Sequence, residues 1–192
     1  MIAIINYNAG NTRSVENALS RLGYTCTITS SLQELQTASK VIFPGVGEAR
    51  SAMKVLKDTG IDKLLPTLTQ PVLGICLGMQ LMCDYSEEGD TRGLGIFPIV
   101  VRHFPPSQRV PHMGWNTMSN FQSPLFTGIT ESDDFYFVHS YKADVSPYTI
   151  ATCDYIEPFS AAINKNNFYA TQFHPEKSGD VGMQLLKNFI EL

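Results

Sequence analysis

The sequence is short of charge and has no excess of basic residues. Of its 192 residues, 14 are Lys or Arg and 18 are Asp or Glu, and charged residues make up only 17%. Nucleic-acid binding usually needs a basic face, so the net charge of −4 argues against that class of protein. Because 43% of the residues are hydrophobic, we expect one folded domain over residues 1–192, with part of its low-charge surface covered by a partner.

The sequence also lacks a long hydrophobic run and any paired cysteine motif. No stretch approaches the roughly 18 residues that a membrane span needs, and the apolar opening is too short for a signal peptide. None of the four cysteines belongs to a Cys-x-x-Cys pair, so no zinc site is expected. We therefore expect a cytoplasmic protein with reduced cysteines, no metal and no membrane association. Cys26 and Cys153 fall in apparent strands and are expected to be buried.

The first half of the chain alternates strand-like apolar runs with helical stripes. Strands are expected at 2–6, 24–29, 41–43 and 72–75. Helices are expected from the N-cap Asn11 to 22, at 31–38, from about 48 to 57, and at 77–82. Strands that alternate with helices in this way predict a parallel sheet with helices on both faces.

The second half changes character and predicts antiparallel strands. Strands are expected at 95–102, 135–138, 149–153, 160–164 and 168–172, and a helix at 183–192. Residues 164–167 are typical of a hairpin turn. The predicted fold class is therefore α/β, with a mixed, mostly parallel sheet flanked by helices and with antiparallel strands late in the chain.

The sharpest local feature is Gly74-Ile75-Cys76-Leu77-Gly78, which follows a buried strand and opens a helix. A strand-to-helix turn this tight strains the backbone at its centre, and the two glycines leave room for the chain to reverse. The Cys76 side chain would then project at the carboxyl end of the strands, where open α/β sheets bind ligands. The helix start favours a thiolate, and the N–H of Leu77 is a natural oxyanion donor. We interpret Cys76 as a nucleophile; the alternative is a buried cysteine in a glycine-rich turn.

A thiol nucleophile usually needs a base, and the chain has four histidines. His103 and His112 lie near prolines in apparent loops and are interpreted as surface residues, while His139 ends a strand and suits a structural hydrogen bond. His174 differs because a proline and then Glu176 follow it. The proline favours extended geometry at His174, which puts Glu176 on the same side of the chain. We interpret this pair as a base and its orienting carboxylate, against the alternative of incidental polar residues in a turn.

Two segments resemble the motifs of the class I, or triad, glutamine amidotransferases: Gly74-Ile75-Cys76-Leu77-Gly78-Met79-Gln80 and Gln172-Phe173-His174-Pro175-Glu176. The loop 44–47 sits where these enzymes place their glutamine-binding and oxyanion loop. Three further segments are similar to one branch, the glutaminase subunits of imidazole glycerol phosphate synthase: 110–116, 136–141 and Tyr7-Asn8-Ala9-Gly10-Asn11. Asn8 stands where glycine is common in that branch. The resemblance covers the whole chain and implies a flavodoxin-like fold.

The resemblance implies a role for each matching residue and no cofactor. Cys76 would attack the side-chain amide of glutamine, His174 would move protons, and Glu176 would orient His174. The oxyanion hole would be formed by Leu77, Val46 and Gly47. The glutamine would be held by Gly47, Gln80, Ser140 and Tyr141. A partner subunit would be contacted by Asn11, Met113, Trp115 and Asn116.

The resemblance also implies a second subunit. Ammonia is mostly protonated in neutral water, so a glutaminase that feeds a synthesis must pass it on without exposure to solvent. Neither the P-loop nor the dinucleotide glycine motif occurs, so the chain shows no site for a phosphorylated acceptor. Similar enzymes carry that chemistry on a (β/α)8-barrel cyclase, which makes imidazole glycerol phosphate and aminoimidazole carboxamide ribotide. Trp115, the only tryptophan, lies in an apparent loop and is a plausible interface anchor or else a partly buried core residue.

Three alternatives remain open from the sequence. The chain can belong to the glutaminase of anthranilate, GMP or pyridoxal phosphate synthesis, which the segment around Trp115 disfavours. It can be another Cys–His hydrolase, which Glu176 and Gln80 disfavour. It can be a non-catalytic binding module, which the intact residues Cys76, His174 and Glu176 disfavour.

Overall fold

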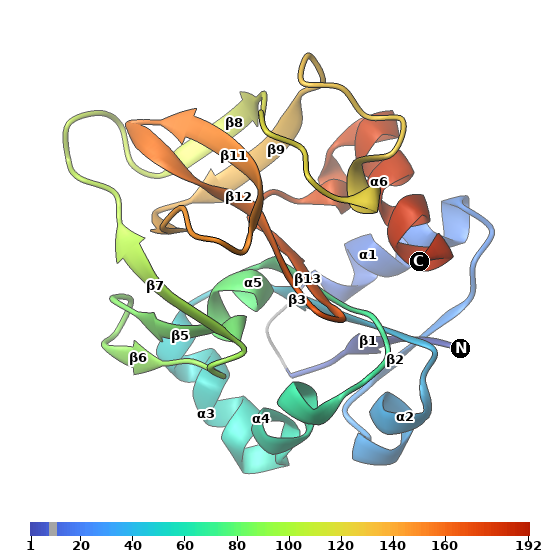
Figure 1. Ribbon diagram of the computed structural model, residues 1–192. Helices are drawn as coiled ribbons and strands as arrows, with labels where there is room; N and C mark the ends of the chain where they lie inside the picture. Colours follow the sequence, from blue (N-terminus) through green and yellow to red (C-terminus); the bar gives the residue numbers. More distant parts are fainter. Residues whose placement is uncertain (8–10) are drawn as a thin grey trace.

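The computed structural model describes residues 1–7 and 11–192, which form three β-sheets and the helices around them (Figure 1). The turn expected through Asn8, Ala9 and Gly10 lies outside the described residues. Within the described part of the chain, no helix is long and apolar enough to cross a membrane.

The largest sheet has seven strands in the order β11-β12-β13-β4-β3-β1-β2. Its strands are β1 (Ile2–Ile5), β2 (Cys26–Thr29), β3 (Lys40–Gly45), β4 (Val72–Cys76), β11 (Thr149–Tyr155), β12 (Glu157–Lys165) and β13 (Phe168–Thr171). The strands from β13 to β2 run parallel, whereas β12 and β11 extend the sheet in antiparallel fashion. This confirms the expected α/β fold with a mostly parallel sheet and late antiparallel strands.

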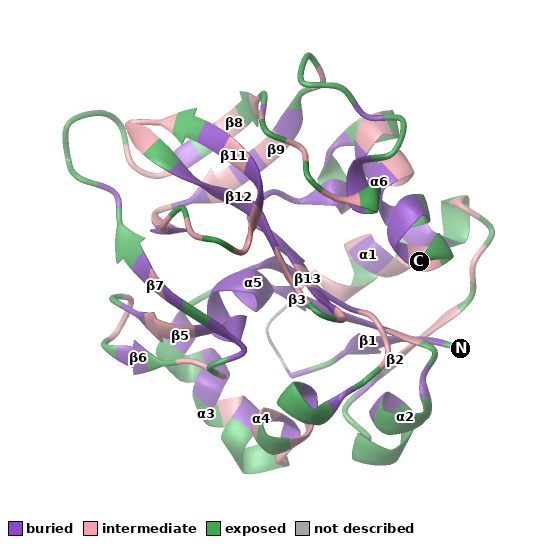
Figure 2. Ribbon diagram, viewed as in Figure 1, coloured by how far each residue is buried: buried purple, intermediate pink, exposed green. Residues whose placement is uncertain are grey.

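Alternate residues of the parallel strands enter two hydrophobic cores, one on each face of this sheet. In β1, Ala3 and Ile5 belong to one core, and Ile2 and Ile4 to the other. Figure 2 shows the central strands β1 and β3 largely buried and the outer side of α2 exposed. A strand buried on both faces must be apolar throughout, which is why β1 and β4 are short hydrophobic runs in the sequence. The edge strand β2 is mostly half-buried and contains two threonines.

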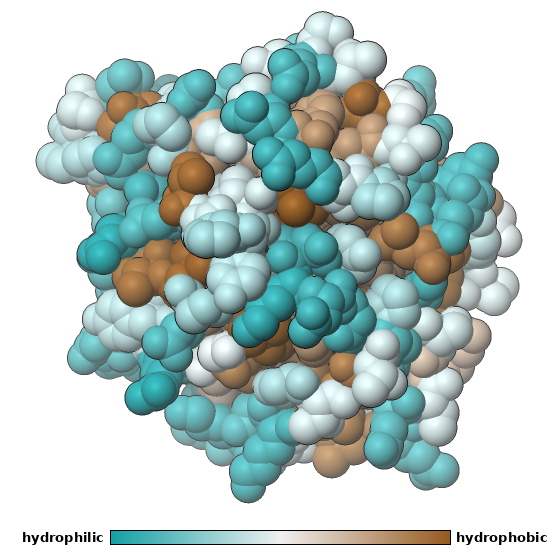
Figure 3. All heavy atoms as spheres, in the orientation of Figure 1, coloured by the Kyte–Doolittle hydropathy of each residue, from teal (hydrophilic) through white to brown (hydrophobic). Residues whose placement is uncertain are grey.

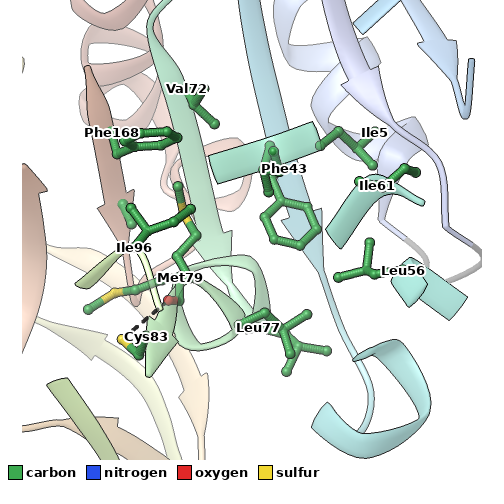
Figure 4. Packing of buried hydrophobic residues seen from close by; sticks show 14 of the residues in the cluster. Ile5, Phe43, Leu56, Ile61, Val72, Leu77, Met79, Cys83, Ile96 and Phe168 are labelled. Carbon is green, nitrogen blue, oxygen red and sulfur yellow. Dashed lines mark hydrogen bonds between the residues drawn. The ribbon is translucent and has the colours of Figure 1, made fainter. Parts of the chain in front are cut away.

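Helices cover the two faces unequally (Figure 1). One core receives α2 (Leu32–Thr37), α3 (Ala49–Thr59), α4 (Ile61–Leu64) and α5 (Leu77–Met82). The other receives α1 (Thr12–Arg21) and α6 (Gly179–Glu191). Figure 4 shows the first core, where Phe43 of β3 lies among side chains of neighbouring strands and helices that include Ile5, Leu56, Ile61 and Leu77.

Local capping signals fix where α3 begins and ends. The side chain of Glu48 accepts from the N–H groups of Arg50 and Ser51 at the start of α3, and Gly60 ends α3 in the left-handed conformation with φ 75°. The next two helical elements, α4 and the 3-10 turn Leu65–Thr67, have no such side-chain cap and were not predicted from the sequence. α6 begins at Gly179 rather than at residue 183.

The expected single sheet is wrong for the middle of the chain, which forms two smaller sheets instead. One has the order β10-β7-β5-β6, with β5 (Cys83–Ser86), β6 (Thr91–Arg92), β7 (Phe97–His103) and β10 (Tyr141–Ala143). The other pairs β8 (His112–Asn116) with β9 (Phe135–His139). The expectation of a loop around Trp115 is therefore also wrong. Proline and glycine near β8 resemble breakers, but a two-stranded ribbon has only edge strands, which tolerate both.

We expect Gly78→Ala to lower the free energy of unfolding by roughly 3 kcal/mol, because its new methyl group would collide with the carbonyl oxygen of Phe43. Gly23→Ala is the matched control: Gly23 has φ 82° with open space around it, so only backbone strain of about 1 kcal/mol is added. Urea unfolding of both variants provides the measurement. Equal losses of stability would contradict the steric explanation.

Candidate active site

Cys76 lies at the junction of β4 and α5 in a strained backbone conformation. Its φ of 53° and ψ of −109° fall where residues with a side chain are rarely found. Two close approaches leave no space for side chains beside it. A Cβ at Gly74 would lie 2.5 Å from the Met82 sulfur, and one at Gly78 would overlap the carbonyl of Phe43. The two glycines predicted to allow the chain reversal are therefore also required because neighbouring atoms leave no space for a side chain.

His174 and Glu176 form the expected pair beside Cys76. Nδ1 of His174 lies 2.7 Å from Oε1 of Glu176, and both side chains are almost completely buried. His174 is extended, as predicted, with φ −100° and ψ 96°. The route to Glu176 differs from the prediction, because Pro175–Lys177 form a 3-10 turn rather than continued strand. The turn brings the carboxylate back to the imidazole.

The charge state of His174 follows from its two neighbours. Burial lowers the pKa of His174, but hydrogen bonding and charge interactions with Cys76 and Glu176 outweigh burial and raise the pKa. Nδ1 is taken by Glu176, and Nε2 makes no hydrogen bond to another described group, so the interaction with Cys76 falls to Nε2. The arrangement favours the imidazolium form of His174 beside Cys76.

Asn11 stabilises the pair of His174 and Glu176, a role that the sequence did not reveal. It occupies the predicted N-cap position of α1, with φ 87°, but its side chain makes no cap hydrogen bond. Instead its amide donates to Oε1 of Glu176. Asn11 thereby holds the same carboxylate oxygen that orients His174. The sequence placed Asn11 at the end of the family-like segment 7–11 and at a partner interface, but nothing in that segment pointed to Glu176.

A cavity of about 380 Å³ lies over Cys76, in the size range of small-molecule sites. All the residues expected to bind glutamine or its oxyanion line the cavity: Val46, Gly47, Leu77, Gln80, Ser140 and Tyr141. Val46 and Gly47 follow β3, and Gly47 has a φ of 109°. The carboxyl ends of β3 and β4 therefore bring the loop and the nucleophile together, as parallel pairing requires.

Glu88 also lines this cavity and was missed by sequence reasoning. It lies between β5 and β6, two short strands that were not predicted, so nothing in the sequence connected it with Cys76. Burial raises the pKa of Glu88, and the charge of Glu48 adds to this, although the N–H of Ala49 donates to its carboxylate and opposes the shift. A carboxylate here suits a positively charged group in the cavity. No group of residues that could hold a metal ion occurs in the described ranges.

Of the residues expected at a partner interface, Met113 and Trp115 have exposed side chains, whereas the side chain of Asn116 makes a hydrogen bond within the chain. Met113 and Trp115 are among the most exposed hydrophobic side chains, at 54% and 57%. Figure 3 shows that hydrophobic residues on the face in view gather in small, separate patches on a largely hydrophilic surface. Asn116 donates to the carbonyl of Asp154 at 3.3 Å. Exposure of two large apolar side chains on one ribbon is typical of an interaction surface.

The ribbon that carries these side chains also borders Cys76 and His174. Met113 pairs with Val138, and Trp115 pairs with Tyr136, across β8 and β9. The carbonyl of Val138 lies 3.9 Å from the Cys76 sulfur, and the carbonyl of Tyr136 accepts from the His174 N–H at 3.0 Å. Each exposed side chain is therefore paired across the ribbon with a residue whose backbone carbonyl contacts Cys76 or His174.

His112 is buried, so its interpretation as a surface residue is wrong. Its Nδ1 lies 3.0 Å from Nε2 of His139, whose own Nδ1 lies 2.7 Å from the carbonyl of Tyr141. The ring of His112 stacks on Tyr155 at 4.0 Å. The error arose because side chains alternate between the two faces of β8. His112 lies on the covered face of the ribbon, whereas Met113 and Trp115 lie on the exposed face. His139 has the structural hydrogen bond that was predicted, and Cys26 is half-buried rather than buried.

The sequence matches a family model and curated proteins over essentially its whole length. Residues 3–192 match the family model described as glutamine amidotransferase class-I. The chain is 58% identical over 194 residues to imidazole glycerol phosphate synthase subunit HisH of Bacteroides fragilis, with 100% of this chain and 99% of that protein covered. The HisH subunit of Pasteurella multocida is 50% identical over 192 residues, with 99% and 97% covered.

Solved structures at low sequence identity share the fold. A crystal structure of a glutamine amidotransferase superimposes with a TM-score of 0.79 at 18% identity, over 100% of this chain and 98% of that one. A putative GMP synthase subunit from Thermoplasma acidophilum gives a TM-score of 0.75 at 19% identity, over 99% and 92%. At these identities the likeness establishes the fold alone.

We expect the two buried histidines to make the fold acid-sensitive. Burial lowers the pKa of His112 to about 4 and, aided by nearby positive charge, that of His139 to about 3. Between the ordinary value of about 6.5 and these values, the unfolded chain binds protons that the folded chain does not. The free energy of unfolding should therefore fall by about 1–2 kcal/mol per histidine as the pH drops from 7 to 5.

Urea unfolding at pH 7 and pH 5 measures this effect. His112→Gln should show a smaller loss on acidification than the wild type, whereas the exposed His103→Gln should show the full loss. A wild-type pH dependence in His112→Gln would contradict the assignment.

Proposed function

We propose a catalytic role for each residue around Cys76 on the premise that the chain belongs to the class-I glutamine amidotransferase family, and within it to the HisH subunits of imidazole glycerol phosphate synthase. Its activity is that of a glutaminase, which serves imidazole glycerol phosphate synthesis in histidine biosynthesis. Membership in this branch excludes the anthranilate, GMP and pyridoxal phosphate branches.

The observation that carries the proposed mechanism is the buried series Cys76, His174 and Glu176, of which Cys76 and His174 line the cavity and Glu176 lies behind His174. The Cys76 thiolate attacks the carboxamide carbon of glutamine, and the carbonyl oxygen becomes an oxyanion. As this intermediate collapses, the C–N bond breaks and Nε2 of His174 gives its proton to the departing ammonia. A thioester remains on Cys76.

The second half of the reaction uses the same residues in reverse. His174, now neutral, removes a proton from a water molecule that attacks the thioester carbon. The C–S bond breaks, glutamate leaves, and the thiolate and imidazolium are restored. Glu176 holds Nδ1 throughout, which keeps Nε2 directed at the reacting groups and stabilises the imidazolium. Asn11 fixes the carboxylate in that position.

Oxyanion stabilisation is assigned to the N–H of Leu77 and to the loop of Val46 and Gly47. Leu77 is the first residue of α5, so its N–H has no partner within the helix. Val46 and Gly47 line the same cavity as Leu77 and Cys76. Removing one such donor typically costs about 2.7–4 kcal/mol of transition-state stabilisation.

The amino-acid end of glutamine needs one anionic and several neutral polar partners. Glu88 supplies the anionic group in the cavity and is assigned to the α-ammonium group. Gln80, Ser140, Tyr141 and Gly47 complete the substrate site. The amide nitrogen of Gln80 already donates to the carbonyl of Tyr141 and to Gln172, which leaves its oxygen for the substrate.

The ammonia produced is assigned to a (β/α)8-barrel cyclase subunit bound at the ribbon of β8 and β9. The exposed Met113 and Trp115 supply the apolar anchors, with Asn11 and Asn116 at the same interface. A heterodimer of this kind covers part of the low-charge surface and passes ammonia on without release to solvent. All four cysteines are free, which fits the proposed cytoplasmic location.

Cys76→Ala should abolish glutamine hydrolysis while leaving the fold intact, because no other described thiol lines the cavity. The assay is ammonia release from glutamine by the purified variant together with its cyclase partner. The same complex should still form product when ammonium salt is supplied, since only the source of ammonia is lost. Residual hydrolysis at the wild-type rate would remove Cys76 from the mechanism.

Partner binding should raise the glutaminase rate, and binding of the cyclase's nucleotide substrate should raise it further. The reason is the loop of Val46 and Gly47, whose glycine-flanked peptide planes rotate at low cost and present the second oxyanion donor in only one state. An increase of roughly 10²–10³ corresponds to one such donor. Rates of the lone chain, the complex and the complex with nucleotide test this. Equal rates in all three would rule out a switching loop.

A further inference from the structure

Gln172 is a buried amide in direct contact with the proposed nucleophile. It directly follows β13, has no solvent exposure, and is fixed by its own N–H, which donates to the carbonyl of Ala161 at 2.8 Å. Its side-chain nitrogen donates to the Cys76 sulfur at 3.7 Å, within the range of sulfur hydrogen bonds. Nothing in the mechanism above uses this contact.

The neighbouring groups fix which end of the Gln172 amide faces the sulfur. The carbonyl of Tyr141 can only accept, so the side-chain nitrogen of Gln80 must face it, at 2.9 Å. The same nitrogen donates to Oε1 of Gln172, also at 2.9 Å. If the Gln172 amide were reversed, two NH2 groups would face each other in a buried site. The chain of amides therefore has one polarity, and it ends with an N–H directed at sulfur.

The other groups around the sulfur show what this donor does. The carbonyl of Val138, 3.9 Å away, accepts from a thiol but repels a thiolate. The titratable groups that act on the sulfur are His174, with Glu176 behind it, and the hydroxyl of Tyr7, whose pKa burial and the charge of Cys76 raise. When His174 transfers its proton to ammonia, its positive charge is lost. The Gln172 donor keeps its position in every step.

We propose that Gln172 is a further catalytic residue, whose side-chain amide, held in one orientation by Gln80 and the Tyr141 carbonyl, donates to the Cys76 sulfur and stabilises it as a thiolate. The donor acts when the thiolate attacks glutamine and again when it leaves the thioester. This inference rests on the proposed role of Cys76 as nucleophile. It also gives Gln80 a second task, because the residue that lines the substrate site orients the donor to the nucleophile.

Two substitutions separate this role from a purely structural one. Gln172→Glu keeps the oxygen that accepts from Gln80 and places an acceptor, rather than a donor, against the sulfur. Gln172→Met removes both hydrogen bonds while preserving length and burial, and adds no charge. Gln33→Glu makes the same change of charge on the exposed surface of α2 and is the matched control. Thermal unfolding identifies which variants are folded.

The direct readout is the rate at which iodoacetamide alkylates Cys76 as a function of pH, followed by mass spectrometry of the Cys76 peptide. Burial raises the pKa of Cys83 and of Cys153, so those thiols react little at neutral pH. We expect the midpoint of the Cys76 profile to move to higher pH in Gln172→Met, to move further in Gln172→Glu, and to stay in place in Gln33→Glu.

Glutaminase assays of the complex with the cyclase complete the test. A hydrogen bond to a charged group corresponds to roughly a 10- to 100-fold loss of kcat, and KM should change less because the cavity groups that hold glutamine remain. A folded Gln172→Met or Gln172→Glu with the wild-type alkylation profile would overturn the inference, whatever its kcat. Failure of Cys76 itself as nucleophile would appear separately, as glutamine hydrolysis in Cys76→Ala.

Discussion

The strained backbone at Cys76 is the constraint on which the rest of the site depends. A residue with a side chain is held at φ 53° only if its surroundings leave it no alternative. Those surroundings are the sheet itself: β3 passes so close to α5 that a side chain at Gly78 would meet the Phe43 carbonyl. The hydrophobic core that packs β3, β4 and α5 together therefore also fixes the position of the Cys76 side chain. The same close contacts that stabilise this part of the fold thus also hold Cys76 in its strained conformation.

Sequence patterns predicted the parts of the site that lie next to one another along the chain. The elbow around Cys76 and the pair of His174 and Glu176 each occupy a few consecutive residues, so local geometry was enough to find them. The parallel sheet followed from apolar runs because strands buried on both faces cannot alternate. From the sequence, only the resemblance to a family brought Cys76 and His174 together. In the structure they meet because β4 and β13 pair in parallel, which places the ends of both strands at one edge of the sheet.

The missed features all depend on contacts between distant segments. Asn11 reaches Glu176, Gln172 reaches Gln80 and Cys76, and Glu88 enters the cavity from a turn between two very short strands. A polar residue that stabilises a partner far along the chain has no local pattern. His112 was misassigned for the same reason, since a strand that pairs only with one other strand shows neither the length nor the composition of a sheet interior.

The ribbon of β8 and β9 has a thermodynamic consequence. Its outer strand presents Met113 and Trp115, and its inner strand supplies the carbonyls of Tyr136 and Val138 that contact His174 and Cys76. Coupling free energies between two binding sites are reciprocal. To the extent that docking of the cyclase shifts the inner carbonyls, the chemical state of Cys76 must change the affinity for the cyclase by an equal free energy. Under the proposed mechanism, acylation of Cys76 would then change the affinity for the cyclase. The lifetime of the thioester would be one determinant of how long the two chains remain together.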